Sequence, residues 1–460
     1  MPGRADAIAL AERCFDSGDY LAALRRLVAV RTESQRPDAL PELRRYCAQT
    51  IPALIDGMGF ETAVVENPKP GCGPVLLATR IEDPARPTVL IYGHGDVVHG
   101  QAGRWSEGLD PWSVIERDGR WYGRGTVDNK GQHLVAIEAL RAVLATRGRL
   151  GFNARLFIET GEEVGSPGLR EMLAADPARF AADLFVGFDG PRQTRSRPEL
   201  RLGARGGVAF DLVVKLRDHA AHSGHWGGVL ADPGFILAHA LSSIVTRQGR
   251  ILVDGWTPRA IPDAVRRACA SIVFEDLPGL PVPDAGWGEP GLSKAERIFA
   301  WTSVVVLAFI TGHPDAPTNA VQPEARARVQ VRHTVDVDGT GILPALRRHL
   351  DARGLQQVGI VPVAERDSFP AGRTDPENPW VVKLAASLAQ TAGQAPNMVP
   401  NSSGGNPTET FLSGLRAPVV WLPSGYAGSQ QHAPDEHGLP EMLREGLRLT
   451  TGVWWDLGAA

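Results

Sequence analysis

The sequence predicts an α/β protein in which a large, mostly parallel sheet covered by helices is interrupted by a smaller α/β sandwich. A chain of 460 residues exceeds what one hydrophobic core normally supports, which favours two domains. From about residue 75 onward, apolar runs alternate with loops and helical segments, which is typical of a parallel sheet. The pattern changes near Leu202 and returns after about residue 370. We therefore predict a larger domain made of residues 1–202 and 371–460, with a second domain inserted at 203–370.

The larger domain is expected to begin with helices. Residues 8–60 contain Ala-rich and Leu-rich segments broken near Pro37 and Pro41, which predicts helices separated by a loop. Short apolar runs and longer periodic runs then predict, in order, a strand from Thr88 to about His94, a helix at 133–144, strands at 153–158 and 182–188, a helix at 380–393 and a strand at 417–422.

The inserted domain has its own set of predicted elements. They are strands at 208–215, 325–333 and 357–364, and amphipathic helices at 233–247 and 343–353. The most apolar run, residues 304–310, is far shorter than the about 20 residues that cross a bilayer. We expect a buried element there, and we expect most of the Pro-rich and Gly-rich segment 250–320 to serve in packing.

The composition is that of an ordinary soluble protein, with 43% hydrophobic and 22% charged residues. A net charge of -4 without a basic cluster argues against nucleic acid as a partner, and no apolar stretch argues for a membrane. The four cysteines lack Cys-x-x-Cys spacing, so neither a disulfide framework nor a cysteine zinc site is expected. The first residues lack the apolar core of a signal peptide, and we expect a cytoplasmic protein.

A motif of chemical interest lies at the end of the first predicted strand, where His94 and Asp96 are two positions apart. Open α/β sheets bind their ligands at the carboxyl ends of strands. An imidazole at that place suits a metal ion, and a nearby carboxylate fixes its tautomer and orientation. Taken alone, the pair is better explained as a chance match or an ordinary loop histidine.

Further side chains of the metal-ligand type follow other predicted strands or turns. They are Asp128 in the turn before the helix at 133–144, Glu162 and Glu163 after the strand at 153–158, Asp189 after the strand at 182–188, and His432 in the loop after the strand at 417–422. Any one of them would be explained as a solvated loop residue. Because several strand ends and turns carry such residues, we infer a metal site at this edge of the sheet.

Several blocks of the sequence resemble the dinuclear zinc metallopeptidase and amidohydrolase family that includes glutamate carboxypeptidase, carnosinase, aminoacylase, acetylornithine deacetylase and succinyl-diaminopimelate desuccinylase. The blocks are GHGDVV, RWSEGLDPWSVIERDGRWYGRGTVDNKGQ, ETGEEVGSPG, GFDG, HSGHWGG and HAPDE, and they span nearly the whole chain in order. HSGHWGG in particular is more similar to the carboxypeptidase-like and dipeptidase-like members. The resemblance implies a zinc-binding catalytic domain interrupted by a smaller lid domain that is often used for dimerisation.

The resemblance also implies the ligands of two divalent cations. His94, Asp128 and Asp189 match the ligands of one cation, and Asp128, Glu163 and His432 match those of the other, so that Asp128 bridges the two. Mixed imidazole and carboxylate ligands suit Zn²⁺ and also admit Co²⁺ or Mn²⁺. Two cations that share a carboxylate lower the pKa of a bridging water and polarise the scissile carbonyl.

Three further roles follow from the same resemblance. Glu162 matches the general base that takes a proton from the water and delivers it to the leaving amine. Asp96 matches the partner that orients His94, and the peptide bond after the bridging Asp128 is expected to be cis. His222 of HSGHWGG matches a histidine that reaches into the active site of a partner subunit and stabilises the oxyanion.

Substrate-binding residues are expected in two segments. Arg332 matches an arginine that pairs with the free carboxylate of the substrate, which suits the fork geometry of a guanidinium. Other arginines alternate along the same strand, so an exposed basic face is the alternative. Asn319 matches a position that donates to the substrate. Gly405 and Asn406 belong to a turn that holds the same carboxylate, but Asn406 replaces a serine and the turn is one residue shorter, which leaves the substrate side chain open.

We therefore predict a homodimeric, metal-dependent hydrolase that cleaves a peptide or amide bond of a small carboxylate-bearing substrate, as a dipeptidase or carboxypeptidase does. The first alternative is an amidohydrolase that acts on N-acyl amino acids or other non-peptide amides. The second, a metal-binding dimer without catalysis, is disfavoured because Glu162 and every matched ligand are present. The sequence lacks a Gly-x-Ser-x-Gly motif, which argues against a serine hydrolase.

Overall fold

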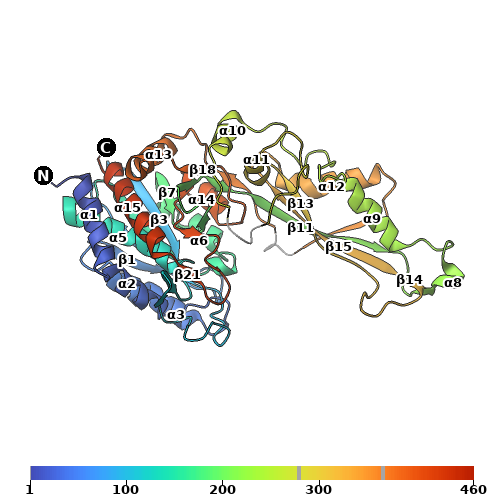
Figure 1. The fold of residues 1–460 in the computed structure, drawn as a ribbon, viewed down its shortest axis with the longest axis horizontal. Helices are drawn as coiled ribbons and strands as arrows, with labels where there is room; N and C mark the ends of the chain where they lie inside the picture. The colour runs from blue at the N-terminus through green and yellow to red at the C-terminus, as the bar shows by residue number, and fades with distance from the viewer. Residues whose placement is uncertain (1, 277–280, 364–367, 460) are drawn as a thin grey trace.

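The computed structural model describes residues 2–276, 281–363 and 368–459. It confirms the predicted α/β fold class. The molecule is elongated, with both termini in a larger body and a narrower part that extends away from it (Figure 1). This narrower part is built on strands between Gly206 and Pro362 and is called the lid below. Among the described residues, no helix combines the length and the hydropathy that a membrane span requires.

The larger body contains an eight-stranded sheet whose four central strands run parallel. Its strands, in spatial order, are β1 (Glu61–Val65), β2 (Val75–Arg80), β6 (Asn153–Glu159), β3 (Thr88–His94), β7 (Leu184–Gly187), β19 (Val419–Trp421), β9 (Glu199–Arg201) and β18 (Asn397–Val399). β3 pairs in parallel with β6 on one side and β7 on the other. The connection from β3 runs through α5 on one face of the sheet, and the connection from β6 runs through α6 and α7 on the other face, which opens a crevice at the carboxyl ends of these two strands.

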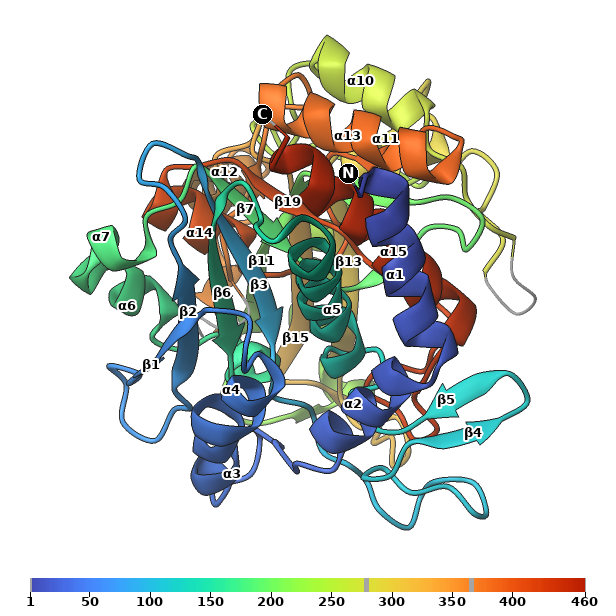
Figure 2. The same cartoon turned by 90° about the vertical axis from the view of Figure 1, so that its left-hand side faces the viewer.

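Helices cover both faces of this sheet and form two separate cores (Figure 2). One face is covered by α1 (Arg4–Asp16), α2 (Asp19–Val28), α5 (Lys130–Arg147), α13 (Pro379–Ala392) and α15 (Pro440–Leu457), and the other by α6 (Leu169–Ala175), α7 (Pro177–Phe180) and α14 (Thr408–Leu415). The predicted helix at 133–144 is the central part of α5. Most of α5 is buried, and it ends at Gly148, whose φ of 77° is a common helix end.

Short elements connect and extend the two parts. In the larger body they are α3 (Leu40–Arg45), α4 (Ile51–Leu54), β4 (Ile115–Arg117), β5 (Arg120–Tyr122), β8 (Pro191–Arg192), β10 (Gly203–Ala204), β17 (Gly372–Arg373), β20 (Gly425–Tyr426) and β21 (His437–Gly438), and near the lid tip they are β12 (Ala221–His222), α8 (Ser223–Trp226) and β14 (Ala320–Val321). β21 pairs with β5, which brings a C-terminal segment beside the turn that precedes α5.

The lid is a four-stranded antiparallel sheet with helices on one face. Its strand order is β13 (Ser303–Thr311), β15 (Glu324–His333), β11 (Gly206–Lys215), β16 (Gly359–Pro362), and α9 (Pro233–Ile244) and α12 (Ile342–Asp351) share its core. Trp256 is buried there and donates from Nε1 to the carbonyl of Ile342 at 2.9 Å. The predicted strand at 357–364 is shorter than expected, and its last residue lies outside the described residues.

One prediction in the lid is wrong. Residues 304–310 were expected to be buried, but they form most of β13, an edge strand that α9 covers only in part. Val305, Leu307, Phe309 and Ile310 are each between 46% and 57% exposed. The reason is positional, because an apolar run is buried only if another element covers it. In the rest of the segment 250–320, α10 (Asp263–Ala270) and α11 (Lys294–Phe299) pack on β18 as expected, whereas residues 277–280 lie outside the described residues.

Candidate metal centre

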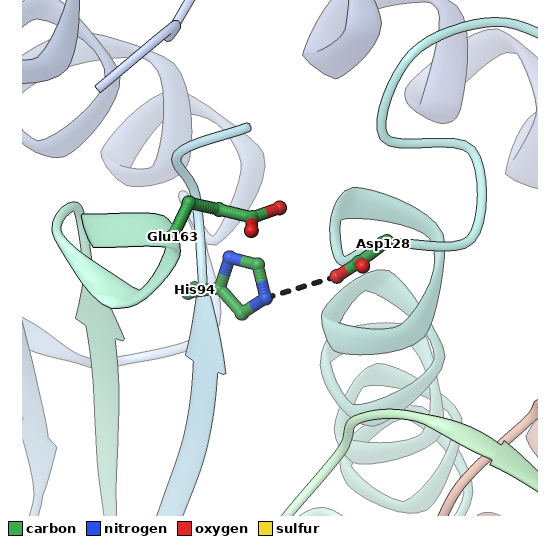
Figure 3. Close-up of side chains that lie close together, drawn as sticks. All are labelled: His94, Asp128 and Glu163. Atoms are coloured by element: carbon green, nitrogen blue, oxygen red, sulfur yellow. Dashed lines mark ion pairs between the residues drawn. The ribbon is translucent and has the colours of Figure 1, made fainter. Parts of the chain in front are cut away.

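The predicted metal ligands meet at the carboxyl end of the central strands. His94 is the last residue of β3, Glu162 and Glu163 lie in the helical turn after β6, Asp189 follows β7, Asp128 lies in the turn before α5, and His432 lies in the loop between β20 and β21. The register of the sheet contributes to this arrangement, because His94 pairs with Glu159 at the end of β6. Figure 3 shows three of these side chains pointing toward one another from three different elements.

Asp128 occupies the middle of the group. Its Oδ1 lies 3.1 Å from Nε2 of His94, and its Oδ2 lies 3.1 Å from Nε2 of His432. Each imidazole also faces a second carboxylate: His94 Nε2 is 4.0 Å from Asp189 Oδ1, and His432 Nε2 is 3.0 Å from Glu163 Oε2. The side chains thus form two triads that share one carboxylate.

The donor atoms of these triads fit divalent cations. His94 is fully buried, yet its Nε2 has no hydrogen-bond partner despite the nearby carboxylate oxygens, and Oε1 of buried Glu163 has none either. Buried polar atoms without partners are uncommon in proteins. Imidazole nitrogen and carboxylate oxygen are zinc ligands, and three protein ligands for each cation leave a coordination position open.

The electrostatics of the group agree with that fit. Burial raises the pKa of Glu163 to about 7, and the neighbouring charge of Asp128 acts in the same direction. Burial alone would lower the pKa of His94, but Asp128 and Asp96 hold it well above its usual value. Hydrogen bonds to Asp128 and Glu163 raise the pKa of His432 to about 11. Protons therefore compensate the crowded carboxylates when no cation is bound, and metal binding would displace them.

Asp96 connects the first triad to the turn that carries Glu162. Its carboxylate oxygens accept from the backbone N–H groups of Glu162 at 3.3 Å and Glu163 at 3.1 Å. Nδ1 of His94 lies 3.1 Å from the Asp96 carbonyl oxygen and 3.5 Å from its Oδ1. The fully buried Asp96 side chain therefore fixes the positions of a predicted ligand and of the predicted base together.

The carboxylate of Glu162 has no hydrogen-bond or ion-pair partner within the described ranges, unlike that of Glu163. Burial raises its pKa well above the usual value, with His94 opposing that shift and Asp189 adding to it. A carboxylate that is close to the triads but not committed to a partner is suited to proton transfer.

Sequence reasoning missed two contributors to the centre. Asn129 donates from Nδ2 to Asp189 Oδ1 at 2.9 Å and accepts at Oδ1 from the backbone N–H of His94 at 3.2 Å. The Asp128–Asn129 peptide bond is cis, as expected. Glu436 accepts from the backbone N–H of Asp128 at 3.1 Å. Both residues lie inside blocks that resemble the family, but only the folded structure shows what they contact.

Arg332 and Gly405 both lie against one aromatic ring. The Arg332 guanidinium stacks over Phe369 at 5.0 Å, and a Cβ at Gly405 would lie 2.9 Å from the same ring. Nη1 of Arg332 is buried without a partner. The other arginines of its strand, Arg326 and Arg328, instead contact the carboxylate of Asp211 across the sheet.

Asn406 makes a hydrogen bond within its own turn, whereas His222 and Asn319 lie far from the metal ligands. Oδ1 of Asn406 accepts from the hydroxyl of Thr408 at 2.6 Å at the start of α14. His222 is exposed at the start of α8, and the carbonyl of Asn319 accepts from the N–H of Ser223 at 2.9 Å. Figure 1 shows α8 and β14 at the far end of the lid from β3. These two predicted residues are therefore together, but remote from the metal ligands of their own chain.

Comparison with known proteins agrees with this arrangement. The model of Peptidase family M20/M25/M40 matches residues 90–456, which is most of the chain. The chain belongs to this peptidase family. The group of histidine and carboxylate side chains described above supports the use of metal ions.

Similar proteins include two dipeptidases and one solved structure. Beta-Ala-His dipeptidase of Mus musculus is 34% identical over 259 residues, which cover 53% of this chain and 52% of that protein. Cysteinylglycine-S-conjugate dipeptidase of Corynebacterium striatum is 28% identical over 388 residues, with 82% of each chain covered. The match thus spans about half the length of the first relative. The crystal structure of human carnosine dipeptidase 1 has a TM-score of 0.75 at 23% identity with both chains covered completely, which shows the common fold.

Proposed function

We propose that the protein is a dinuclear, metal-dependent dipeptidase that hydrolyses the amide bond of a small peptide with a free carboxylate. The observation that carries the proposal is the position of Asp128, whose two oxygens face two different histidines at 3.1 Å each. A carboxylate in that position suits a bridge between two cations. The names of the two dipeptidase relatives support the choice of a dipeptide substrate.

In this proposal, His94, Asp128 and Asp189 hold one cation, and Asp128, Glu163 and His432 hold the other. Zn²⁺ suits this mixture of imidazole and carboxylate, with Co²⁺ and Mn²⁺ as alternatives. When bound, the cations supply an acidic water and polarise the carbonyl of the substrate.

Glu162 acts as general base and then as general acid. Its uncommitted carboxylate accepts a proton from the attacking water, and the same proton goes to the leaving amine as the C–N bond breaks. Asp96 holds the backbone of Glu162 and Glu163 and so keeps the base beside the ligands. Arg332, together with Gly405, which also lies against the Phe369 ring, is the proposed site for the substrate carboxylate.

A substrate screen distinguishes the dipeptidase from the alternative amidohydrolase of N-acyl amino acids. We expect the protein loaded with Zn²⁺, Co²⁺ or Mn²⁺ to release amine from unmodified dipeptides and to lose that activity when the substrate is N-acetylated. Amine release is measured over matched pairs that differ only in the acetyl group. Turnover of the acetylated member alone would instead establish the amidohydrolase.

We also propose that the protein acts as a homodimer. Arg332 pairs with Gly207 at the start of β11, and Gly405 lies against the same Phe369 ring as Arg332, whereas His222 and Asn319 are in the segments beside α8 and β14, which Figure 1 shows at the far end of the lid. If all four residues serve one substrate, the tip residues come from a second chain. A cytoplasmic location remains part of the proposal, supported by four cysteines that are all free thiols.

The edge strand β13 provides a surface for such a dimer. It has nine residues without a charged side chain, SVVVLAFIT, and its last seven are exposed. Exposed apolar edge strands promote aggregation unless another chain covers them. The opposite edge strand, β16, has only four residues and ends at a proline. A second copy of the chain, related by a two-fold axis, could pair its own β13 with this one. That pairing would cover the exposed β13 edge of each of the two chains.

Complementation between two inactive variants tests the dimer and the role of His222. We expect Glu162→Gln and His222→Ala subunits to be nearly inactive alone and to regain activity when mixed. The mixed dimer has one site with an intact Glu162 from one chain and an intact His222 from the other. With random exchange and independent sites, about half of the dimers are mixed and about a quarter of wild-type activity returns.

Subunit exchange is verified first, by native mass spectrometry of differently tagged chains. Mixing two preparations of the same variant serves as the control and should restore nothing. If exchange is complete and activity does not return, His222 acts within its own chain or has no role in catalysis.

A further inference from the structure

The loop that carries His432 depends on contacts with other parts of the chain. Gln430, His432 and Asp435 all have positive φ, at 54°, 63° and 63°, although none is glycine. Non-glycine residues adopt this conformation at a cost and keep it only where surrounding contacts impose it. The His432 side chain is also 56% exposed, so packing alone does not fix its position.

A buried carboxylate ties this loop to the turn that carries Asp128. Glu436 is fully buried, and its Oε1 accepts from the backbone N–H of Gly125 at 3.0 Å and of Asp128 at 3.1 Å. Its backbone carbonyl accepts from the N–H of Gly123 at 3.0 Å, which extends the β5–β21 pairing into the turn. One residue of the loop thus holds the backbone on which the shared carboxylate is mounted.

Arg124 joins Glu436 to the residue next to His432. The guanidinium is fully buried, and Nη1 donates to Glu436 Oε2 at 2.6 Å while Nη2 donates to the carbonyl of Ala433 at 2.9 Å. The Arg124 side chain therefore contacts the loop at two places, Ala433 and Glu436. Because it comes from the 123–129 turn itself, any movement of the turn is transmitted to the loop.

Two further contacts tie the loop to the segment that contains residues 101 and 106, and they are closer to solvent. Gln101 donates from Nε2 to the carbonyl of His432 at 3.0 Å, and Ser106 donates from its N–H to Asp435 Oδ1 at 2.8 Å. Both hydrogen bonds are exposed, where water competes for the same groups. Charge-assisted hydrogen bonds in a dry site are stronger and hold geometry more tightly. The Arg124–Glu436 pair is therefore the main constraint on the distance between the two segments.

We propose that the Arg124–Glu436 pair is a positioning unit that sets the spacing between the Asp128 carboxylate and the His432 imidazole. It thereby sets the affinity for the second cation, which is the one assigned to Asp128, Glu163 and His432. The proposal rests on the ligand assignment given under Proposed function. Neither Arg124 nor Glu436 is among the proposed metal ligands or substrate-binding residues. The pair acts through Asp128 and His432, which lie 304 residues apart in the sequence and 3.1 Å apart in space. Residues that orient metal ligands commonly contribute about 10–100-fold in metal affinity.

Zn²⁺ binding by Glu436→Gln tests this inference against a matched control. The control is Glu296→Gln, because Glu296 is also buried, contacts Arg266 Nη1 at 2.6 Å and accepts from the N–H of Ser293 at 2.7 Å, in a cluster that contains no residue of the metal centre. We expect Glu436→Gln to keep one cation and to bind the second about 10–100-fold more weakly in chelator competition. Its kcat should fall at limiting Zn²⁺ and recover at saturating Zn²⁺, with KM unchanged, while Glu296→Gln binds both cations as the wild type does.

A second pair of variants keeps the test decisive if Glu436→Gln does not fold. Arg124→Lys retains the positive charge toward Glu436 and should bind the second cation more tightly than Arg124→Met. Equal affinities in these two variants, or wild-type affinity for both cations in Glu436→Gln, would overturn the positioning role. Wild-type protein that binds fewer than two cations would instead refute the ligand assignment, so the two failures are distinguishable.

Discussion

Replacing Glu162 by glutamine is expected to remove most turnover while the fold and the metal content stay intact. The amide has nearly the shape of the carboxylate but cannot accept the proton of the attacking water. A positioned acid–base group contributes about 10²–10⁴-fold to the rate, and we expect kcat to fall by an amount in that range or larger. Steady-state kinetics on a dipeptide, with metal content measured on the same sample, provide the readout.

The neighbouring substitution Glu163→Gln is the matched control, because it makes the same chemical change one residue away. Glu163 faces His432 at 3.0 Å and is a proposed ligand, so its variant should lose metal as well as rate. The two variants therefore separate proton transfer from metal binding. Near-normal kcat in Glu162→Gln with full metal content would show that another group is the base.

In the larger body the sequence predicted the four central strands of the sheet together with α5 and α13, because their signals are local, but it did not predict the outer strands β1, β2, β9 and β18. A strand such as β3 is an unbroken apolar run, and the periodic run at 133–144 lies inside α5. Polar side chains such as His94 and Asp189, placed just after such strands, could be located at one edge before their distances were known. The parallel pairing of β6, β3 and β7 then brings those ends together.

The parts that the sequence did not predict depend on contacts between distant segments. An apolar run like that of β13 does not reveal whether it lies at the centre or at the edge of a sheet, and the expectation of burial failed for that reason. In the sequence, Glu436 looks like any other acidic residue of a loop. Its role depends on its hydrogen bonds with Arg124 and with the backbone N–H of Asp128, which only the fold brings together. The separation of His222 from the metal ligands is likewise a property of the whole molecule.

Removal of the metal ions is expected to abolish activity, and added Zn²⁺, Co²⁺ or Mn²⁺ should restore it. The reason is that the proposed reaction needs a water more acidic than bulk water, which side chains alone do not provide. The apoprotein should also be less stable to heat, because a ligand present at 100 times its Kd stabilises the folded state by about 2.7 kcal/mol. Activity, metal content and Tm are measured on the same chelated and reconstituted samples.

Variants of the ligands show whether two cations share one carboxylate. Asp128 contacts both histidines, so Asp128→Ala should lose both cations, whereas His432→Ala should lose only the cation held with Glu163. Because the first triad of His94, Asp128 and Asp189 remains in His432→Ala, that variant should keep about one cation per chain, with much reduced turnover. Full activity in protein verified to be metal-free, or loss of only one cation in Asp128→Ala, would contradict a centre in which Asp128 is the bridge.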